Sequence, residues 1–341
     1  MEEIDFVITW VDGNDPEWQK EKSKYSGIED GDCRIKRYRD WNLLKYWFRG
    51  VEKFAPWVNK IHFVTWGHLP PWLNTKNDRI HVVNHKDFIP GQYLPTFSCR
   101  PIELNLHRIP GLSENFVYFN DDMFLLKSVS KSDFFKNGHP CDTAVLQAVS
   151  MPGKDNDGNI IKPEDYYTAN FYNIPPINRN FQKKKSITRN FTKWFTLVYG
   201  KFNFMNMMLF PWEEFTGFVG FHVPYSYNKN TFEEVWEKEE FLMDRACMHK
   251  FRDNSDVSSR LFTYWQYAKG DFSPRSYKLG KYLPICNTEE KNMKICDAIE
   301  NQKYKFICIN DEYTGNEFEK VQDQLITSFE KIFSNKSSFE K

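Results

Sequence analysis

The sequence predicts an α/β fold that is Rossmann-like, with a mainly parallel sheet and a helical insertion in its second half. Strand patterns alternate with helical patterns through residues 1–126, and this alternation calls for parallel strands joined by right-handed crossovers. Several strand patterns are apolar almost without a break, as in strands covered on both faces. We therefore expect one domain, residues 1–341, in which a Rossmann-like half (1–126) precedes a variable insertion (127–217) and a second half (218–341).

The overall composition argues against partners that are attracted by a global charge. The chain has 46 basic and 46 acidic residues, so no long-range field draws it to nucleic acid, and any anion must be held locally. Its seven cysteines form no Cys-x-x-Cys pair, which fits a reducing cytoplasm better than a disulfide framework. No apolar stretch approaches the about 18 residues that span a bilayer. We expect a cytoplasmic protein and leave open a peripheral association with the inner face of the membrane.

The first predicted strand ends in an acidic loop. Residues 4–11 are rich in β-branched and aromatic side chains, and the pattern breaks at Asp12, Gly13, Asn14 and Asp15. The loop is not a Gly-x-Gly-x-x-Gly fingerprint, and the chain has no Gly-Lys-Ser/Thr phosphate loop. Such a loop is a frequent place to receive a nucleotide, but a plain turn has the same composition, so both interpretations stay open.

Four further elements are predicted between this loop and the strand that begins at Asn115. A helix is predicted over residues 41–54, where apolar side chains share one face and Pro56 ends the pattern. Strands are predicted over 60–65 and 80–83, and a helix over 102–109. These elements supply the alternation from which we infer the parallel sheet.

The strand predicted to begin at Asn115 ends in acidic side chains at the edge of the sheet. The apolar run that begins at Asn115 ends abruptly in Asn120, Asp121 and Asp122. Ligands of open α/β sheets collect beyond the carboxyl ends of the strands, so adjacent carboxylates there would meet a hard cation or a phosphate group. Because Asn and Asp also begin turns, the triplet alone fits a plain turn equally well.

The insertion is less regular. A strand is predicted over residues 144–149 and a surface loop over 153–158. The stretch 179–189 holds five basic residues and no acid, which favours a solvated helix face over a phosphate or membrane contact. We interpret the Met- and Phe-rich stretch 202–212 as core rather than as a lipid contact.

Two helices are predicted near the start of the second half. A capping box at Thr231 opens the first, and the second runs from about Val257, with Gly270 past its end. Arg252 is thereby expected just before a helix N-terminus, where an anion is favoured, although a surface ion pair is the plain alternative. His222 lies in an aromatic setting, where a hydrogen-bonded core histidine is more common than a catalytic one.

A second acid-tipped strand lies near the end of the chain. The apolar run from Tyr304 ends in Asn310 and Asp311, and an amphipathic helix is predicted over 318–333. Two buried strands that deliver acid to one sheet edge could together form an oxygen site for a divalent cation.

The ordered set of motifs resembles the Stealth family of sugar-phosphate transferases. The resemblance covers nearly the whole chain, but residues 127–217 match little of the family pattern. The motifs that carry it are Asp5-Phe-Val-Ile-Thr-Trp-Val-Asp-Gly-Asn-Asp15, Arg37-Tyr-Arg-Asp40, Ala55-Pro-Trp-Val-Asn-Lys-Ile61, Leu94-Pro-Thr-Phe-Ser98, Phe119-Asn-Asp-Asp122, His222-Val-Pro224 and Ile309-Asn-Asp311.

The resemblance implies a glycosyltransferase-A-like fold and a specific reaction. Such enzymes transfer a hexose 1-phosphate, for example GlcNAc 1-phosphate, from a UDP-sugar to a sugar hydroxyl. They form a phosphodiester in a capsule or cell-surface polysaccharide and release UMP. The implied partners are a UDP-sugar donor and an oligosaccharide or polysaccharide acceptor, with lipid linkage of the acceptor left open.

The resemblance also implies roles for individual residues. Asp122 and Asp311, with Asn310, would hold Mg²⁺ or Mn²⁺, and Asp121 is a neighbour that contributes. Arg252 would grip the diphosphate. His222 would act as general base on the acceptor hydroxyl, with a pKa near its usual value of about 6.5, or would at least position that hydroxyl, in which case Asp121 or Asp40 is the catalytic base. The loop of Asp12, Gly13, Asn14 and Asp15 would meet the uridine or sugar, and Arg37, Arg39 and Asp40 would line the same mouth.

Two other functions fit the same residues. A metal-dependent glycosyltransferase would use the same donor and a similar acid-tipped strand, but it would release UDP. A non-catalytic carbohydrate-binding protein would use the abundant aromatic residues, 17% of the chain, as stacking platforms.

Overall fold

A central five-stranded sheet lies at the heart of the molecule. The computed structural model describes residues 3–27, 38–150 and 169–341. The strand order is β3-β2-β1-β4-β8, in which the first four strands run parallel and β8 is antiparallel to β4. The prediction of a mainly parallel sheet is confirmed. The five strands are β1 (Ile4–Thr9), β2 (Ile61–Thr65), β3 (Ile80–Asn84), β4 (Asn115–Phe119) and β8 (Tyr225–Asn228).

Strands β1 and β4, in the middle of the sheet, are buried on both faces, as their mostly apolar sequences indicate. In the register of β1, Phe6 lies between Ile61 of β2 and Val117 of β4, and all three side chains are buried. Helix α2 (Leu44–Phe54) covers one face, because Trp47 packs edge-on against Phe119 with ring centroids 5.4 Å apart.

A second, three-stranded sheet brings together the two ends predicted to carry acid. It has the order β10-β11-β5 and consists of β10 (Gly280–Tyr282), β11 (Phe306–Cys308) and β5 (Met123–Leu125). β11 is therefore not a strand of the central sheet. Because β5 and β11 are antiparallel, the backbone N–H of Ile309 donates to the carbonyl of Asp122 at 2.7 Å. The segments after β4 and β11 thus meet, although through a different sheet from the one predicted.

Two predicted elements of the middle region differ in the structure. The predicted helix 102–109 is helix α3 (Cys99–Leu104) followed by a 3-10 turn, Leu106–Arg108. Residues 144–149 form only an isolated bridge, Leu146 to Phe218, and the predicted loop 153–158 lies outside the described residues. A third small sheet lies beside this region and consists of β6 (Phe135–Lys136), β7 (His139–Asp142) and β9 (Ser273–Pro274).

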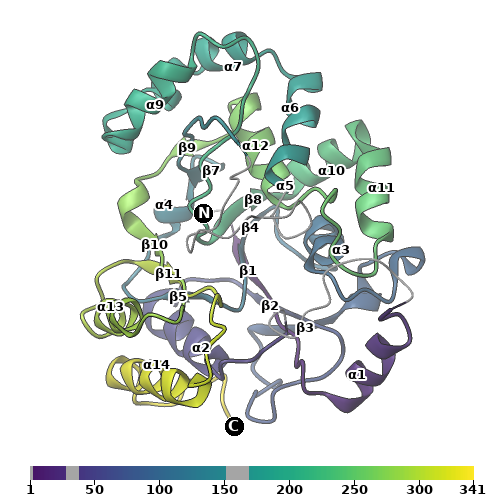
Figure 1. The fold of residues 1–341 in the computed structure, drawn as a ribbon, viewed down its shortest axis with the longest axis vertical. Helices are drawn as coiled ribbons and strands as arrows, with labels where there is room; N and C mark the ends of the chain where they lie inside the picture. Colours follow the sequence, from purple (N-terminus) through teal and green to yellow (C-terminus); the bar gives the residue numbers. More distant parts are fainter. Residues whose placement is uncertain (1–2, 28–37, 151–168) are drawn as a thin grey trace.

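Helices form the periphery (Figure 1). Helices α7 and α9 lie at the end of the molecule opposite α14 and the C-terminus (Figure 1). Among the described residues, no helix is both long enough and apolar enough to cross a bilayer. The other helices are α1 (Pro16–Ser23), α4 (Lys131–Phe134), α5 (Ala169–Tyr172), α6 (Ile174–Asn180), α7 (Lys183–Arg189), α8 (Phe191–Trp194), α9 (Phe202–Leu209), α10 (Lys229–Lys238), α11 (Glu240–Met248), α12 (Arg260–Lys269), α13 (Glu289–Glu300) and α14 (Phe318–Ile332).

Two helix starts differ from those predicted. Helix α10 begins at Lys229, so Thr231 lies in its first turn and is not the cap. Helix α12 begins at Arg260, eight residues after Arg252. Arg252 therefore lies in the preceding loop and is not adjacent to a helix N-terminus.

Candidate active site

A cavity of about 610 Å³ opens beyond the carboxyl ends of β1 and β4. Thr9 at the end of β1 and Asn120 after β4 line it, which is the place where open α/β sheets bind ligands. A second cavity, of about 590 Å³, lies by the amino end of β4 and is lined by none of the predicted site residues. The charged residues and the histidines that line the first cavity are Arg39, Asp40, His85, Arg100, Glu103, Asp121, Asp122, His222, Arg252, Arg260 and Asp311.

The carboxyl groups after β4 lie in surroundings that disfavour their charged forms. The Oδ1 atom of Asp122 is buried and has no hydrogen-bond partner among the described residues. Burial raises the pKa of Asp122 to about 6. Asp121 is accessible within the cavity, yet its position deep in the protein and the charges of Asp122 and Asp40 raise its pKa to about 8. A divalent cation would relieve both effects, and carboxylate oxygens are the ligands that Mg²⁺ prefers.

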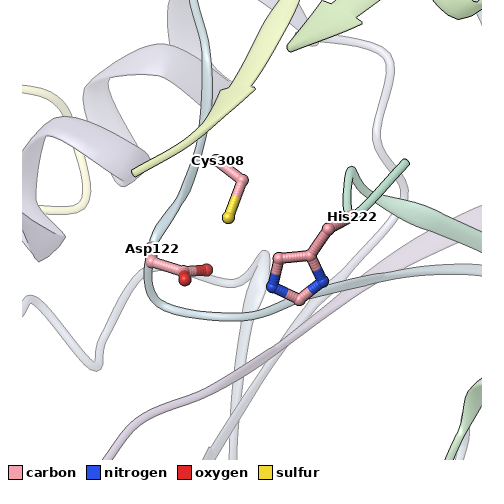
Figure 2. Close-up of side chains that lie close together, drawn as sticks. All are labelled: Asp122, His222 and Cys308. Atoms are coloured by element: carbon pink, nitrogen blue, oxygen red, sulfur yellow. The ribbon is translucent and has the colours of Figure 1, made fainter. Parts of the chain in front are cut away.

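Asp122 also lies close to a histidine and a cysteine (Figure 2). One ligand atom each from Asp122, His222 and Cys308 falls within 4.8 Å of the others. Burial and the neighbouring Asp122 raise the pKa of the Cys308 thiol well above its usual range, so the sulfur keeps its proton. A protonated thiol is a poor metal ligand. The chemistry of this trio therefore fits a site for a hard cation at Asp122 better than a soft-metal site.

His222 is held by a tyrosine and an arginine. Its Nδ1 atom lies 2.9 Å from the hydroxyl of Tyr225 and 3.3 Å from a guanidinium nitrogen of Arg260. A guanidinium can only donate, so we assign Nδ1 as an acceptor and place the ring proton on Nε2. In Figure 2 the ring nitrogen farther from the backbone faces Asp122. His222 therefore presents an N–H group, and not a free lone pair, on that side.

The protonation of His222 differs from the expectation. Burial lowers its pKa to about 3, and the charges of Arg260, Arg100 and Arg252 act in the same direction. The expected pKa near 6.5 is therefore wrong for this environment. The imidazole is neutral at pH 7, and it is a weaker base than an ordinary histidine.

Four arginines line the cavity, and of these Arg39 and Arg252 were expected there. The guanidinium of Arg252 donates to the sulfur of Cys99 at 3.0 Å. Arg100 lies on α3, and Arg260 is the first residue of α12. Arg260 reaches His222 across Gly220, because a Cβ atom on Gly220 would lie 1.6 Å from a guanidinium nitrogen.

One sequence signal could have revealed one of the missed arginines. A cation in the first turn of a helix opposes the helix dipole, so Arg260 at the start of α12 is itself an indication that an anion is nearby. We find no such signal for Arg100.

Asp311 and Arg39 bind each other in the structure. The guanidinium of Arg39 donates to both carboxylate oxygens of Asp311, at 2.7 and 2.6 Å, and to the carbonyl of Tyr313 at 2.7 Å. The side-chain amide of Asn310 donates to the hydroxyl of Tyr282 at 3.0 Å. The structure thus places the predicted ligands Asp311 and Asn310 at the cavity but does not group their ligand atoms with those of Asp122.

The acidic loop after β1 is a turn and a helix cap. The carboxylate of Asp12 accepts from the backbone N–H of Asn14 at 2.9 Å, and Asp15 caps α1. Gly13 allows close packing, because a Cβ atom there would lie 2.1 Å from the carbonyl oxygen of Tyr38. Asp12, Gly13, Asn14 and Asp15 do not line the cavity, so the plain-turn interpretation fits this loop better than the predicted substrate contact.

The motif Arg37-Tyr-Arg-Asp40 lies only partly among the described residues. Asp40 lines the cavity and accepts from the backbone N–H of Asn42 at 2.7 Å. Burial raises the pKa of Asp40, and the charge of Asp12 adds to the effect. Arg37 lies outside the described residues.

Comparison with known proteins identifies the family. The pattern described as Stealth protein CR2, conserved region 2, matches residues 37–142, and Stealth protein CR1, conserved region 1, matches residues 2–30. The chain is 42% identical to the capsular polysaccharide phosphotransferase WcwK of Streptococcus pneumoniae, over 100% of this chain and 99% of the relative. It is 39% identical to the receptor polysaccharide phosphotransferase WefC of Streptococcus oralis, over 100% of both chains.

Two further comparisons complete the set. The chain is 39% identical to the exopolysaccharide phosphotransferase cps2G of Lactiplantibacillus plantarum, over 99% of this chain and 96% of the relative. Among solved structures, the galactosyltransferase LgtC aligns with 95% of each chain at 11% identity and a TM-score of 0.38. Because the family patterns match both conserved regions and the identity extends along whole relatives, the chain belongs to the Stealth family.

Proposed function

We propose that this protein transfers a hexose 1-phosphate, such as GlcNAc 1-phosphate, from a UDP-sugar to a hydroxyl of a capsular or cell-surface polysaccharide. The observation that carries the proposal is one cavity that combines the uncompensated carboxylates Asp121 and Asp122 with Arg100, Arg252 and Arg260. Phosphoryl transfer requires positioning and charge neutralisation more than covalent chemistry, and these groups supply both. The relatives from Streptococcus pneumoniae and Streptococcus oralis, which are named polysaccharide phosphotransferases, support the same reaction class.

The proposed reaction breaks one bond to phosphorus and forms another. The acceptor oxygen bonds to the phosphorus that carries the sugar. The bond from that phosphorus to the oxygen bridging the two phosphates breaks, and UMP departs with the bridging oxygen. The proton of the acceptor hydroxyl passes to a base on the protein, so that a phosphodiester remains.

The arginines would bind the donor. Guanidinium groups match the geometry of phosphate oxygens and form charge-assisted hydrogen bonds with them. Arg252 and Arg260 come from the two ends of one loop, and Arg100 comes from α3, so they would approach a diphosphate from more than one direction. These contacts orient the donor and stabilise charge on the transferred group.

The carboxylates would hold Mg²⁺ or Mn²⁺. Asp122 is the best-supported ligand, because its Oδ1 atom is buried and unsatisfied, and Asp121 is adjacent. The cation, when bound, neutralises charge on the phosphoryl oxygens. We do not include Asp311 and Asn310 in the ligand set, because Arg39 and Tyr282 engage them in the structure.

We propose that His222 positions the substrate and that Asp40 is the base. With its Nε2 proton, His222 is suited to donate a hydrogen bond to an oxygen of the substrate and position it. We assign the acceptor proton to Asp40, which lines the cavity and whose raised pKa makes it a better base near neutral pH than an ordinary aspartate.

The test is a screen of UDP-sugars for acceptor-dependent release of UMP, with phosphorus NMR of the product. A single phosphate retained in a diester supports the proposal. Release of UDP with a phosphate-free glycoside would instead identify a metal-dependent glycosyltransferase. Absence of turnover with every donor and acceptor in Mg²⁺ and Mn²⁺ would leave a carbohydrate-binding protein.

A further inference from the structure

The surface around α9 exposes an unusual amount of apolar side chain. Leu197 is 97% exposed and Phe204 is 61% exposed, and the other members of this set are each at least 40% exposed. The stretch 202–212, which we interpreted as core, is therefore only partly core. The apolar face, as we call this set, consists of Phe191, Leu197, Val198, Phe204, Met207, Met208 and Trp212.

Helix α9 turns an apolar stripe away from the core. Phe204, Met207 and Met208 follow the i, i+3, i+4 spacing of one helical stripe, and all three are exposed. The buried residue of this helix is Asn206, whose side chain bonds the backbone N–H of Leu146 at 2.7 Å and the carbonyl of Trp194 at 2.8 Å. The helix is thus anchored through a buried amide and turns its apolar stripe to the outside.

Basic residues are interspersed in the sequence with the residues of the apolar face. Residues 169–212 contain seven lysines and arginines and no aspartate or glutamate. Lys184, Lys185, Arg189 and Lys201 are exposed. Lys183 is different, because it is buried and its ammonium group donates to carbonyls at the end of α9.

The position of the apolar face also suits contact with a large flat partner. Helices α7 and α9 lie at one extremity of the molecule, away from its centre (Figure 1). Phe202, on the inner side of α9, packs edge-on against Phe221 with centroids 5.4 Å apart, and Phe221 precedes His222. Helix α9 is thus packed against the segment that leads to His222.

We propose that the apolar face, with its exposed lysines and arginine, docks the protein on an anionic phospholipid bilayer. Aromatic and Met side chains insert at the level of the headgroups, and the basic residues approach the lipid phosphates. Charge complementarity favours this occupant over a second copy of the chain, because two copies would bring two acid-free basic segments together. The inference concerns membrane attachment and does not depend on the reaction proposed above.

The test measures binding of the full-length protein to vesicles by flotation. Vesicles of about 40 mol % phosphatidylglycerol in phosphatidylcholine are compared with pure phosphatidylcholine at low and high salt. We expect binding to the anionic vesicles alone, with a loss of affinity at high salt. The double variant Lys184→Gln, Lys185→Gln should bind about fivefold more weakly for each lysine removed.

The apolar contribution has its own variants. Leu197→Ser with Phe204→Ser should weaken binding to anionic vesicles by at least about tenfold, because each buried methylene adds to the binding energy. Phe241→Ser is the matched control, since Phe241 is 81% exposed on α11, outside the apolar face. Thermal unfolding of each variant establishes that its fold is intact.

Three outcomes would overturn the proposal. The first is no binding to the anionic vesicles, and the second is an equal loss in the Phe241→Ser control. The third is a dimer, detected by analytical ultracentrifugation, that dissociates in the Leu197→Ser, Phe204→Ser variant while vesicle binding is unchanged. The last result would assign the apolar face to a second copy of the chain.

Discussion

The substitution Gly220→Ala should displace the guanidinium of Arg260 while residue 260 itself remains arginine. A Cβ atom at position 220 would lie 1.6 Å from one guanidinium nitrogen of Arg260 and 2.5 Å from its central carbon. Contacts this short are impossible, so the guanidinium must leave its place beside His222. The displaced group is the end of a flexible side chain, and the φ angle of Gly220 is not positive, so the fold itself can accept alanine.

The expected effect falls on the donor. A hydrogen bond to a charged group contributes about 1.5 to 3 kcal/mol, so loss of the Arg260 contact with the diphosphate should weaken UDP-sugar binding by about 10- to 150-fold. The free energy of unfolding should change by less than about 1 kcal/mol. The assays are donor affinity by calorimetry, kcat/KM from UMP release, and thermal unfolding. Gly91→Ala is the control, because no atom lies within 4 Å of a Cβ built there.

A double-mutant cycle decides whether the effect passes through Arg260. In the Arg260→Ala background the added methyl group has no guanidinium to displace, so Gly220→Ala should cost nothing further. Wild-type donor affinity in the single Gly220→Ala variant would refute the reasoning. So would an undiminished loss when Gly220→Ala is combined with Arg260→Ala.

Three further predictions follow from buried charge. Asp122→Asn should abolish turnover yet raise the melting temperature of the metal-free protein, because it removes an uncompensated buried carboxylate, and an unchanged or lower melting temperature would contradict this account. Burial lowers the pKa of His107 to about 3. As the pH falls, the unfolded state is therefore protonated at this histidine before the folded state is, and the stability of the fold decreases below about pH 6.5. At pH 5 the neutral His107 should lower the free energy of unfolding by about 2 kcal/mol. Denaturant titrations should therefore show a smaller loss of stability between pH 7 and pH 5 in His107→Gln than in the wild type. Lys183→Gln should destabilise the fold by about 1 to 3 kcal/mol in the same titrations while Lys184→Gln has no effect, because only the first removes buried hydrogen bonds.

The central sheet could be predicted because its strands differ from their surroundings in composition. The middle strands β1 and β4 are mostly apolar and rich in β-branched and aromatic residues, which is typical of strands covered on both faces. Residues 144–149 have a similar composition, yet they form only an isolated bridge, from Leu146 to Phe218. The backbone N–H of Gln147 donates to the carbonyl of Gly217, but the N–H groups of Ala144 and Leu146 donate to the side chains of Tyr199 and Asn206. Sequence patterns do not reveal where side chains take the place of ladder partners.

The sequence predicts the position of a site residue where that residue directly follows a recognisable strand. Asp121 and Asp122 follow β4 directly, so the edge of the sheet places them. Arg39 and Asp311 are 272 positions apart, and only the folded chain shows that they bind each other. Apolar spacing has a similar limit, because the stripe of α9 fits a core helix equally well until its exposure is known.

The opposite pKa shifts in the cavity have a common consequence for binding. Burial raises the pKa of Asp121 and lowers that of His222, and the carboxylates around Asp121 and the arginines around His222 act in the same directions. Each group is thus held beside charges of the sign that disfavours its own charged form. A diphosphate would offset the positive charge around His222, and a divalent cation would offset the negative charge around Asp121. Since either ligand alone leaves one part of the cavity uncompensated, we expect donor and cation to strengthen each other's binding, which makes the donor affinity measured with and without Mg²⁺ a direct test of how the cavity is organised.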